Sequence, residues 1–240
     1  MSRLERTADG PDCARLEAMS ITDQEDALFR EWRVRRPDAV PDGLADEAQY
    51  LGSKLRILFV MKEVNGTPKD FDLREFLRRA DRPQTWDNVT RWLIGIRSLE
   101  EDLSWSRLTK ISVPQRVEML RSIGVMNLKK SPGSHTTDND SLRHVAREDT
   151  DLLSRQYALY LPTLVICCGS VVAKLFDEAI EAPASRRWQT TKRGVRYRRL
   201  ADDGHLIGFS HPAARAQNNL FYYGLVDAVR EVLGEDQRLS

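Results

Sequence analysis

The sequence predicts an α/β protein: a three-layer α/β/α sandwich with a central, mainly parallel sheet of about four strands. Short apolar runs rich in β-forming residues alternate with segments whose apolar residues recur at helical spacing. Such alternation is typical of a parallel sheet covered by helices on both faces. The chain has 240 residues, of which 41% are hydrophobic, and this length is enough to bury a sizeable core.

The expected strands are short and bounded by glycine, proline or polar residues. They comprise Leu55–Met61, Gly124–Leu128, Thr163–Cys168 and His205–Phe209. Residues 186–200 alternate in character and predict a hairpin that turns at Gly194.

The expected helices lie between these strands. They comprise Ile21–Arg35, Leu73–Leu77, Trp86–Ile96, a helix that ends near Ile123, a long helix from about Asp140 to Tyr160, Val171–Ile180 and Ala216–Leu233. Thr22 or Asp23 is expected to cap the first helix. Residues 1–20 mix charge with glycine and proline, which predicts a loosely attached arm before a single domain over residues 21–240.

Composition excludes several classes of protein. Lys and Arg number 37 against 36 Asp and Glu, so net charge alone indicates neither a nucleic-acid nor a membrane partner. The longest uncharged stretch, Tyr157 to Ala173, is shorter than the ~20 residues of a membrane helix and contains Pro162. Three cysteines are too few for a disulfide framework or a Cys₄ zinc site. We therefore expect a cytoplasmic protein with no membrane association, metal or cofactor.

Polar side chains follow the predicted strands at the points where the strands end. Glu63 follows the first strand, Asn127 ends the second, and His211 follows the fourth. Because ligands of open α/β sheets bind outside the carboxyl ends of the strands, we expect these three side chains to converge on one site. Cationic residues in the adjoining loops would hold phosphates: Lys129, Lys130 and Arg215.

These three residue types suit cleavage of a nucleobase from a sugar. A carboxylate such as Glu63 can orient water or stabilise the oxocarbenium-like transition state of glycosidic cleavage. The amide of Asn127 offers donors and an acceptor that match the edge of a base. His211 can donate a hydrogen bond as negative charge collects on the departing base. Each residue also has a structural alternative: an ion pair for Glu63, a turn for Asn127, and a cap or core position for His211.

Four segments resemble, in order, motifs of the uracil-DNA glycosylase superfamily, over roughly residues 54–233. Residues 62–66 (Lys-Glu-Val-Asn-Gly) are similar to Gly-Glu-Ala-Pro-Gly of the iron–sulfur branch. Residues 127–132 (Asn-Leu-Lys-Lys-Ser-Pro) resemble the Asn-Val-Val-Lys-Cys-Arg-Pro segment, whose asparagine recognises uracil. Residues 164–176 resemble the third strand and its helix, and His-Pro-Ala at 211–213 resembles the His-Pro-Ser motif.

The resemblance implies a DNA-repair enzyme that flips uracil or another deaminated base into a pocket and hydrolyses its N-glycosidic bond. Glu63 and His211 would be catalytic, and Asn127 and Asn65 would bind the base. The superfamily also stacks an aromatic ring on the base after its first motif. Phe71 or Phe76 would occupy that place, and the sequence does not choose between them. Phe76 falls in an apolar helical stripe that is typical of a core, so Phe71 is the residue assigned to the base.

The sequence departs from the superfamily at several positions. The cysteines that hold the iron–sulfur cluster are missing, so no cluster is expected. Lys62 replaces a glycine, Asn65 a proline, and Ala213 a serine that touches phosphate. Two alternatives therefore stay open: a non-catalytic nucleic-acid-binding member of the same fold, and a nucleotide or nucleoside hydrolase.

Residues 186–199 form a basic stretch without an acidic residue. Trp188 and Tyr197 interleave with the cations, a pattern that suits phosphate attraction and base stacking. We assign Arg193 and Arg196 to the nucleic-acid-binding residues; the alternative is a solvated outer hairpin.

Overall fold

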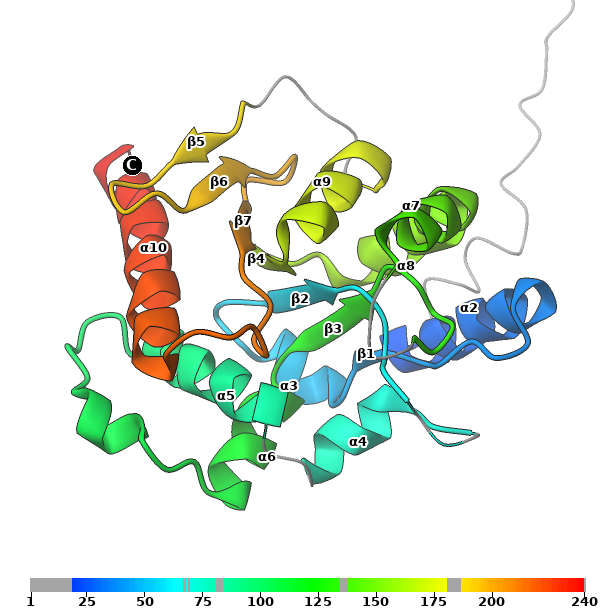
Figure 1. Cartoon of the computed structure of the whole chain (residues 1–240), viewed down its shortest axis with the longest axis horizontal. Coiled ribbons are helices and arrows are strands. Elements are labelled where there is room, and N and C mark those ends of the chain that lie inside the picture. The colour runs from blue at the N-terminus through cyan, green and yellow to red at the C-terminus, as the bar shows by residue number, and fades with distance from the viewer. Residues whose placement is uncertain are drawn as a thin grey trace, which may run out of the picture.

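The computed structural model describes residues 19–66, 68, 70–80, 84–133, 138–180 and 187–239 (Figure 1). Almost all of the predicted arm, residues 1–20, lies outside this range. The described strands form one mixed sheet in the order β1-β3-β2-β4-β7-β6-β5. They are β1 (Gly43–Leu44), β2 (Ile57–Met61), β3 (Gly124–Asn127), β4 (Leu164–Cys168), β5 (Gln189–Thr190), β6 (Arg196–Arg199) and β7 (His205–Phe209).

The four predicted strands are confirmed, and they form the parallel centre of the sheet as β3-β2-β4-β7. The prediction of about four strands in a mainly parallel sheet is wrong. The described strands form a sheet of seven, and it is not mainly parallel. Its other three pairings, β1 with β3, β6 with β7 and β5 with β6, are antiparallel. No pattern in the sequence indicates β1, because this strand has two residues and no apolar run. The hairpin at Gly194 is confirmed and extends the other edge.

Helices cover both faces of the sheet (Figure 1). One face carries α4 (Leu73–Arg79), α5 (Gln84–Arg97), α6 (Val113–Arg121) and α10 (Asn218–Leu239). The other face carries α2 (Ile21–Arg35), α7 (Asn139–Glu148), α8 (Thr150–Tyr160) and α9 (Ser170–Ala179). Two short helical segments complete the described elements, α3 (Glu47–Leu51) and the 3₁₀ turn η1 (Trp105–Leu108). None of the helices in the described parts of the chain is both long and apolar enough to cross a membrane.

Two details of the predicted helices are corrected. The long helix expected from Asp140 to Tyr160 is two helices, which meet at Asp149. The carboxylate of Asp149 is buried and accepts a 2.7 Å hydrogen bond from Arg36, so this junction is held by a long-range ion pair that helical periodicity cannot reveal. The N-cap of α2 is Ser20 rather than Thr22 or Asp23, because the Ser20 side chain accepts from the Asp23 N–H.

Strand β2 lies inside the sheet, between β3 and β4, and is buried along its whole length. Alternate residues enter opposite cores, with Phe59 on the α5 and α10 side and Val60 on the α8 and α9 side. The chain passes from β2 to β3 on one side and then crosses to β4 on the other. Strand order therefore reverses at β2, which places the usual ligand crevice of an open α/β sheet at its carboxyl end.

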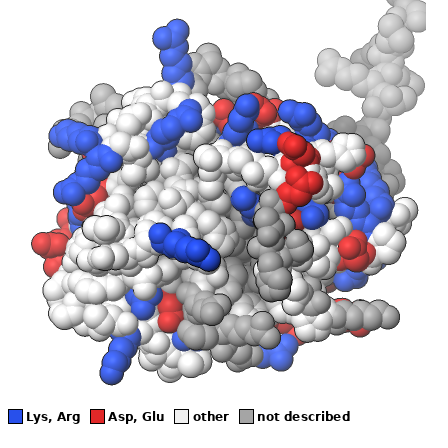
Figure 2. Space-filling view, viewed as in Figure 1, with Lys and Arg blue, Asp and Glu red and all other residues white. Residues whose placement is uncertain are grey.

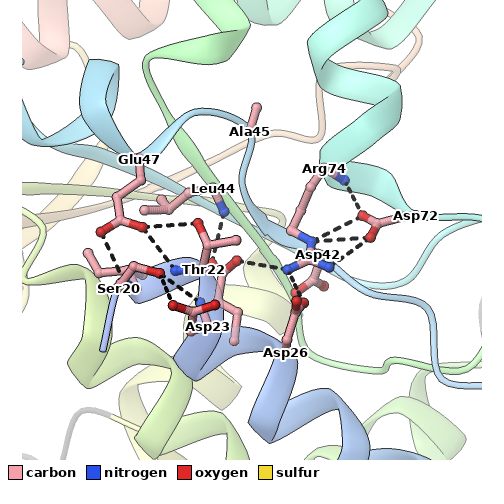
Figure 3. A network of polar contacts seen from close by, with 12 residues as sticks. Ser20, Thr22, Asp23, Asp26, Asp42, Leu44, Ala45, Glu47, Asp72 and Arg74 are labelled. Atoms are coloured by element: carbon pink, nitrogen blue, oxygen red, sulfur yellow. Dashed lines mark hydrogen bonds and ion pairs between the residues drawn. The ribbon is translucent and has the colours of Figure 1, made fainter. Parts of the chain in front are cut away.

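A buried acidic residue joins α2 to β1 and α4. Glu25 is fully buried and accepts a 2.9 Å hydrogen bond from the Leu44 N–H and a 3.2 Å contact from Arg74. Arg74 also pairs with Asp26 and Asp72, as Figure 3 shows. Gly43 permits this arrangement, because a Cβ at that position would collide with the Glu25 carboxyl group.

Glu25 makes a contribution to stability that depends on pH. Burial raises its pKa from 4.5 to about 7, although the Leu44 N–H and Arg74 oppose the shift. The folded state thus binds the proton more tightly than the unfolded state, so this contribution is full below pH 4.5 and is lost as the pH rises through 7. We expect the free energy of unfolding of wild type relative to Glu25→Gln to fall by about 3 kcal/mol across this range. Urea unfolding of both proteins at a series of pH values measures it, and parallel pH profiles would contradict the prediction.

Candidate functional site

The loops that follow β2 and β3 run side by side beyond the ends of the strands. The Leu128 N–H donates to the Met61 carbonyl over 3.0 Å, and the Lys129 N–H donates to the Lys62 carbonyl over 2.9 Å. Farther out, the Gly133 N–H donates to the Val64 carbonyl over 2.8 Å. The structure therefore brings together the two motifs that the sequence places after the first and second strands.

Glu63 is held between these two loops. Its side chain is only 4% exposed, and Oε2 accepts a 2.6 Å hydrogen bond from the Lys129 ammonium. The carboxyl group also lies directly against Gly133, where a Cβ would overlap it. Glu63 therefore does form an ion pair with a lysine, and Lys129 binds this carboxylate in the structure instead of standing free for a phosphate.

Gly133 offers a way to displace Glu63 without replacing it. A methyl group at Gly133 would overlap the Glu63 carboxyl carbon and Oε1, so the side chain must leave its place beside Lys129. We expect Gly133→Ala to lower any activity that depends on Glu63 at least tenfold, because small displacements of a catalytic group are costly. The matched control is Gly224→Ala on α10, where the backbone has no positive φ and a Cβ would meet the Phe209 ring at an ordinary contact distance of 3.4 Å. Equal activities of the two variants, both shown folded by circular dichroism, would contradict the prediction.

Asn127 is 2% exposed and is fixed by a buried carboxylate that the sequence analysis missed. Asp42, just before β1, accepts hydrogen bonds at Oδ2 from the Asn127 backbone N–H (2.8 Å) and from Nδ2 (3.1 Å). The amide is thereby oriented: Nδ2 faces Asp42, and the acceptor Oδ1 lies on the other side of the group. An Asp between Pro and Gly is typical of a turn, so the sequence contains no signal for the contact between Asp42 and Asn127.

Lys130 belongs to the same buried network. Its Nζ donates to both carboxylate oxygens of Asp42 (2.7 and 2.9 Å) and to Gln156 Oε1 (2.7 Å). The ammonium also lies 4.7 Å from the centre of the Trp32 ring. Burial lowers the pKa of Lys130 in spite of Asp42. The prediction that Lys130 binds phosphate is wrong, because its side chain has no exposed surface. The neighbouring Lys129 side chain is instead 18% exposed and reaches Glu63.

His211 is presented as a neutral hydrogen-bond donor. Its Nδ1 accepts from the Ala213 N–H over 3.2 Å, so the proton of the neutral ring resides on Nε2. Burial lowers the pKa of His211, and the positive charge of Lys62 lowers it further. The loop is tied to α5 by Asn88, whose Nδ2 donates to the Pro212 carbonyl over 2.8 Å. Asn88 was not singled out from the sequence, where it lies within an amphipathic helix.

Glu63, Asn127 and His211 lie at one edge of the sheet but do not touch. Asn127 is in register with Met61, and Cys168 is in register with Phe209. With neighbouring strands ~4.8 Å apart, Glu63 and His211 follow strands roughly 10 Å apart, and Asn127 lies one strand farther. Among the hydrogen bonds of the described residues, none joins two of the three. The three residues therefore share the same edge of the sheet and lie at a similar level along the strands, but they do not contact one another.

A groove of about 950 Å³ opens beside His211. Its walls come from the ends of β4 and β7, from α7 and α9, and from the hairpin, with Trp188 and Arg196 among its residues. Glu63 and Asn127 do not line this groove. His211 thus lies between the Glu63 loop, whose Lys62 acts on it electrostatically, and the groove.

The remaining predicted residues lie around this edge. Phe71 is half-buried, 5.7 Å from the Phe76 ring centre, and both rings pack against the α5 side of the core. Asn65 is exposed and pairs with Gly133 in a single parallel bridge. Arg215 is exposed in the loop after His211, and Arg193 pairs with Asp227 over 3.1 Å at the hairpin tip. Their roles in binding stay predictions. Arg186 of the basic stretch lies outside the described residues.

Cys167 and Cys168 are fully buried in β4, and burial raises the pKa of both thiols. A buried thiol with a raised pKa is a poor nucleophile, so neither cysteine suits a catalytic role.

Comparison with known proteins identifies no family for the chain. No protein-family model matches it, and no curated protein matches it either.

Proposed function

We propose that the protein is a DNA glycosylase that hydrolyses the N-glycosidic bond of uracil or another deaminated base. The observation that carries the proposal is the placement of Glu63, Asn127 and His211 at the carboxyl edge of the parallel strands β3-β2-β4-β7, beside the point where strand order reverses. Asn127 ends β3, whereas Glu63 and His211 lie in the loops after β2 and β7. Together they carry the amide, the carboxylate and the imidazole that this reaction needs.

In the proposed reaction, water attacks the sugar carbon as the bond from that carbon to the base nitrogen breaks. The bonding electrons leave with the base, and positive charge develops on the sugar. The Glu63 carboxylate stabilises this charge, orients the water and accepts the proton that the water loses as its oxygen bonds to the sugar carbon. The departing base then takes up a proton from solvent. Lys129 holds Glu63 in place beforehand, and a DNA phosphate near Lys129 would compete for the ammonium and free the carboxylate.

His211 and Asn127 would act on the base. The Nε2–H of neutral His211 donates to a carbonyl oxygen of the base, where negative charge collects on departure. Asn127 Oδ1, held away from Asp42, accepts from a ring N–H. Uracil and hypoxanthine carry such an N–H, whereas cytosine and adenine have an unprotonated ring nitrogen there. An acceptor facing an acceptor leaves both unpaired, so the orientation of the Asn127 amide favours deaminated bases.

The test is base release from oligonucleotides that contain uracil, hypoxanthine or xanthine, with cytosine and adenine as controls. We expect release of at least one deaminated base and of neither control base. Unchanged activity in the double variant Glu63→Ala/His211→Ala would exclude the assignment, as would turnover of free nucleosides but not of DNA.

A second candidate is a nucleic-acid-binding protein of the same fold without catalysis. The observation that favours it is the ion pair between Glu63 and Lys129, which occupies the carboxylate that the reaction needs. Tight, salt-sensitive binding of DNA without release of any base would support this candidate.

A further inference from the structure

The groove beside His211 is lined by several positively charged side chains. Four cationic side chains line it, from α7 (Arg143 and Arg147), α9 (Lys174) and β6 (Arg196). In the upper part of Figure 2, Lys and Arg side chains lie on this face with Asp and Glu side chains among them. Two carboxylates, Asp177 and Glu178, also line the groove, and Arg143 pairs with Asp140 over 2.7 Å. The four cations therefore still exceed the acidic residues of the lining, in a chain whose net charge is only +1.

The acidic residues of the groove are largely neutralised by neighbours. Asp177 accepts from the buried Arg198 guanidinium over 2.6 Å and from Trp188 Nε1 over 2.9 Å. Glu178 pairs with Lys174 over 3.6 Å. By contrast, no carboxylate of the described residues lies within 4.0 Å of the charged nitrogens of Arg147 or Arg196. These two guanidinium groups are therefore available to an anionic partner.

Arg196 is also held in a fixed orientation. Its guanidinium carbon lies 4.7 Å from the centre of the Trp188 ring, within the range of a cation–π contact. The ring is fixed by the Asp177 hydrogen bond and lies close to the backbone at Gly208. A planar guanidinium supported in this way presents one face for stacking and several N–H donors for phosphate oxygens.

We propose that this groove binds the sugar–phosphate backbone of a single nucleic-acid strand and leads it past His211. The inference rests on the proposed function, because it identifies the partner at the His211 end as a nucleic acid. Arg147 on α7 and Arg196 on β6 bind phosphates, and Arg196 on Trp188 supports a base. The groove spans about 950 Å³, room for several nucleotides.

The probe is a fluorescent single strand of about 12 nucleotides, within the usual site sizes of strand-binding grooves, and it contains no deaminated base. Fluorescence anisotropy measures its affinity for wild type and for Arg147→Ala/Arg196→Ala. We expect the double variant to bind about tenfold more weakly at low salt. The slope of log affinity against log salt should become shallower by about 1.4, because a single-strand phosphate contact contributes ~0.7.

The matched control is Arg30→Ala/Arg33→Ala, which removes the same charge from exposed positions on α2. We expect this control to bind as wild type does. Equal losses of affinity in the two double variants would overturn the proposal that the groove binds the strand. The absence of any binding by wild type would overturn it too. Binding of inorganic polyphosphate as tight as that of the oligonucleotide would overturn the assignment to nucleic acid.

Base release by wild type separates this inference from the proposed function. If binding depends on the groove residues and no base is released, the proposed strand-binding groove is retained and the proposed glycosylase activity is rejected. Base release with unaltered binding by Arg147→Ala/Arg196→Ala retains the glycosylase and rejects the groove.

Discussion

Replacing Glu63 with glutamine is expected to slow release of a deaminated base by about 10²- to 10⁴-fold, the usual range for a group that assists proton transfer and charge stabilisation. Glutamine has nearly the same shape but no negative charge, so it cannot stabilise the developing positive charge on the sugar. Because Glu63 is only 4% exposed and its partner Lys129 is retained, the loop should keep its conformation. Single-turnover measurements of base release under saturating enzyme isolate the chemical step.

The matched control for this experiment is Glu75→Gln. Glu75 also pairs with a cation, Arg79, over 2.9 Å, but the pair is exposed on α4. This variant should release the base at the wild-type rate. A rate in Glu63→Gln within twofold of wild type would exclude Glu63 from the catalytic residues and leave its ion pair with Lys129 as a structural contact.

Replacing Lys130 with methionine is expected to lower the free energy of unfolding by about 3–5 kcal/mol, because it leaves the buried Asp42 carboxylate without its cation. Asp42 and Lys130 have no exposed side-chain surface, and only the Gln156 amide and Asn127 would still donate to the carboxylate. Urea unfolding followed by tryptophan fluorescence provides the measurement.

Arg155→Ala is the control for this stability experiment. Arg155 pairs with Glu31 over 2.6 Å, and both side chains are about half exposed, so the loss should stay below about 1 kcal/mol. Where Lys130→Met is still folded, it should bind a nucleic-acid strand as wild type does. A loss of binding greater than the loss of stability would restore Lys130 to the binding residues.

Much of the fold could be predicted from local patterns, and the failures have a common physical cause. The run Ile57–Met61 is buried on both faces, so its continuous hydrophobicity is visible in the sequence. Gly43–Leu44 forms a strand only because β3 offers an edge for pairing, which no local pattern can show. The break at Asp149 depends in the same way on Arg36, which is distant in the sequence.

In the candidate site, too, features set by local sequence patterns could be predicted, and features that depend on distant residues could not. Strand ends predicted that Glu63, Asn127 and His211 would share one edge, because the register of a parallel sheet determines where loops emerge. Asp42, which orients the Asn127 amide, could not be found, since hydrogen bonds between distant loops leave no periodic signal. Adjacent lysines look alike in a sequence, yet Lys129 reaches Glu63 and Lys130 lies in the core.

The contact between Asp42 and Asn127 has a consequence for how base preference would evolve. Asp42 already orients the amide in this structure, so under the proposed function recognition of a base would require no reordering of the Asn127 side chain and would tolerate little adjustment. A lineage that came to prefer a base with a ring acceptor would need the amide to turn over, and Asp42 opposes that rotation. A change in base specificity would therefore begin with substitution of Asp42, which contacts Asn127 and does not contact the base.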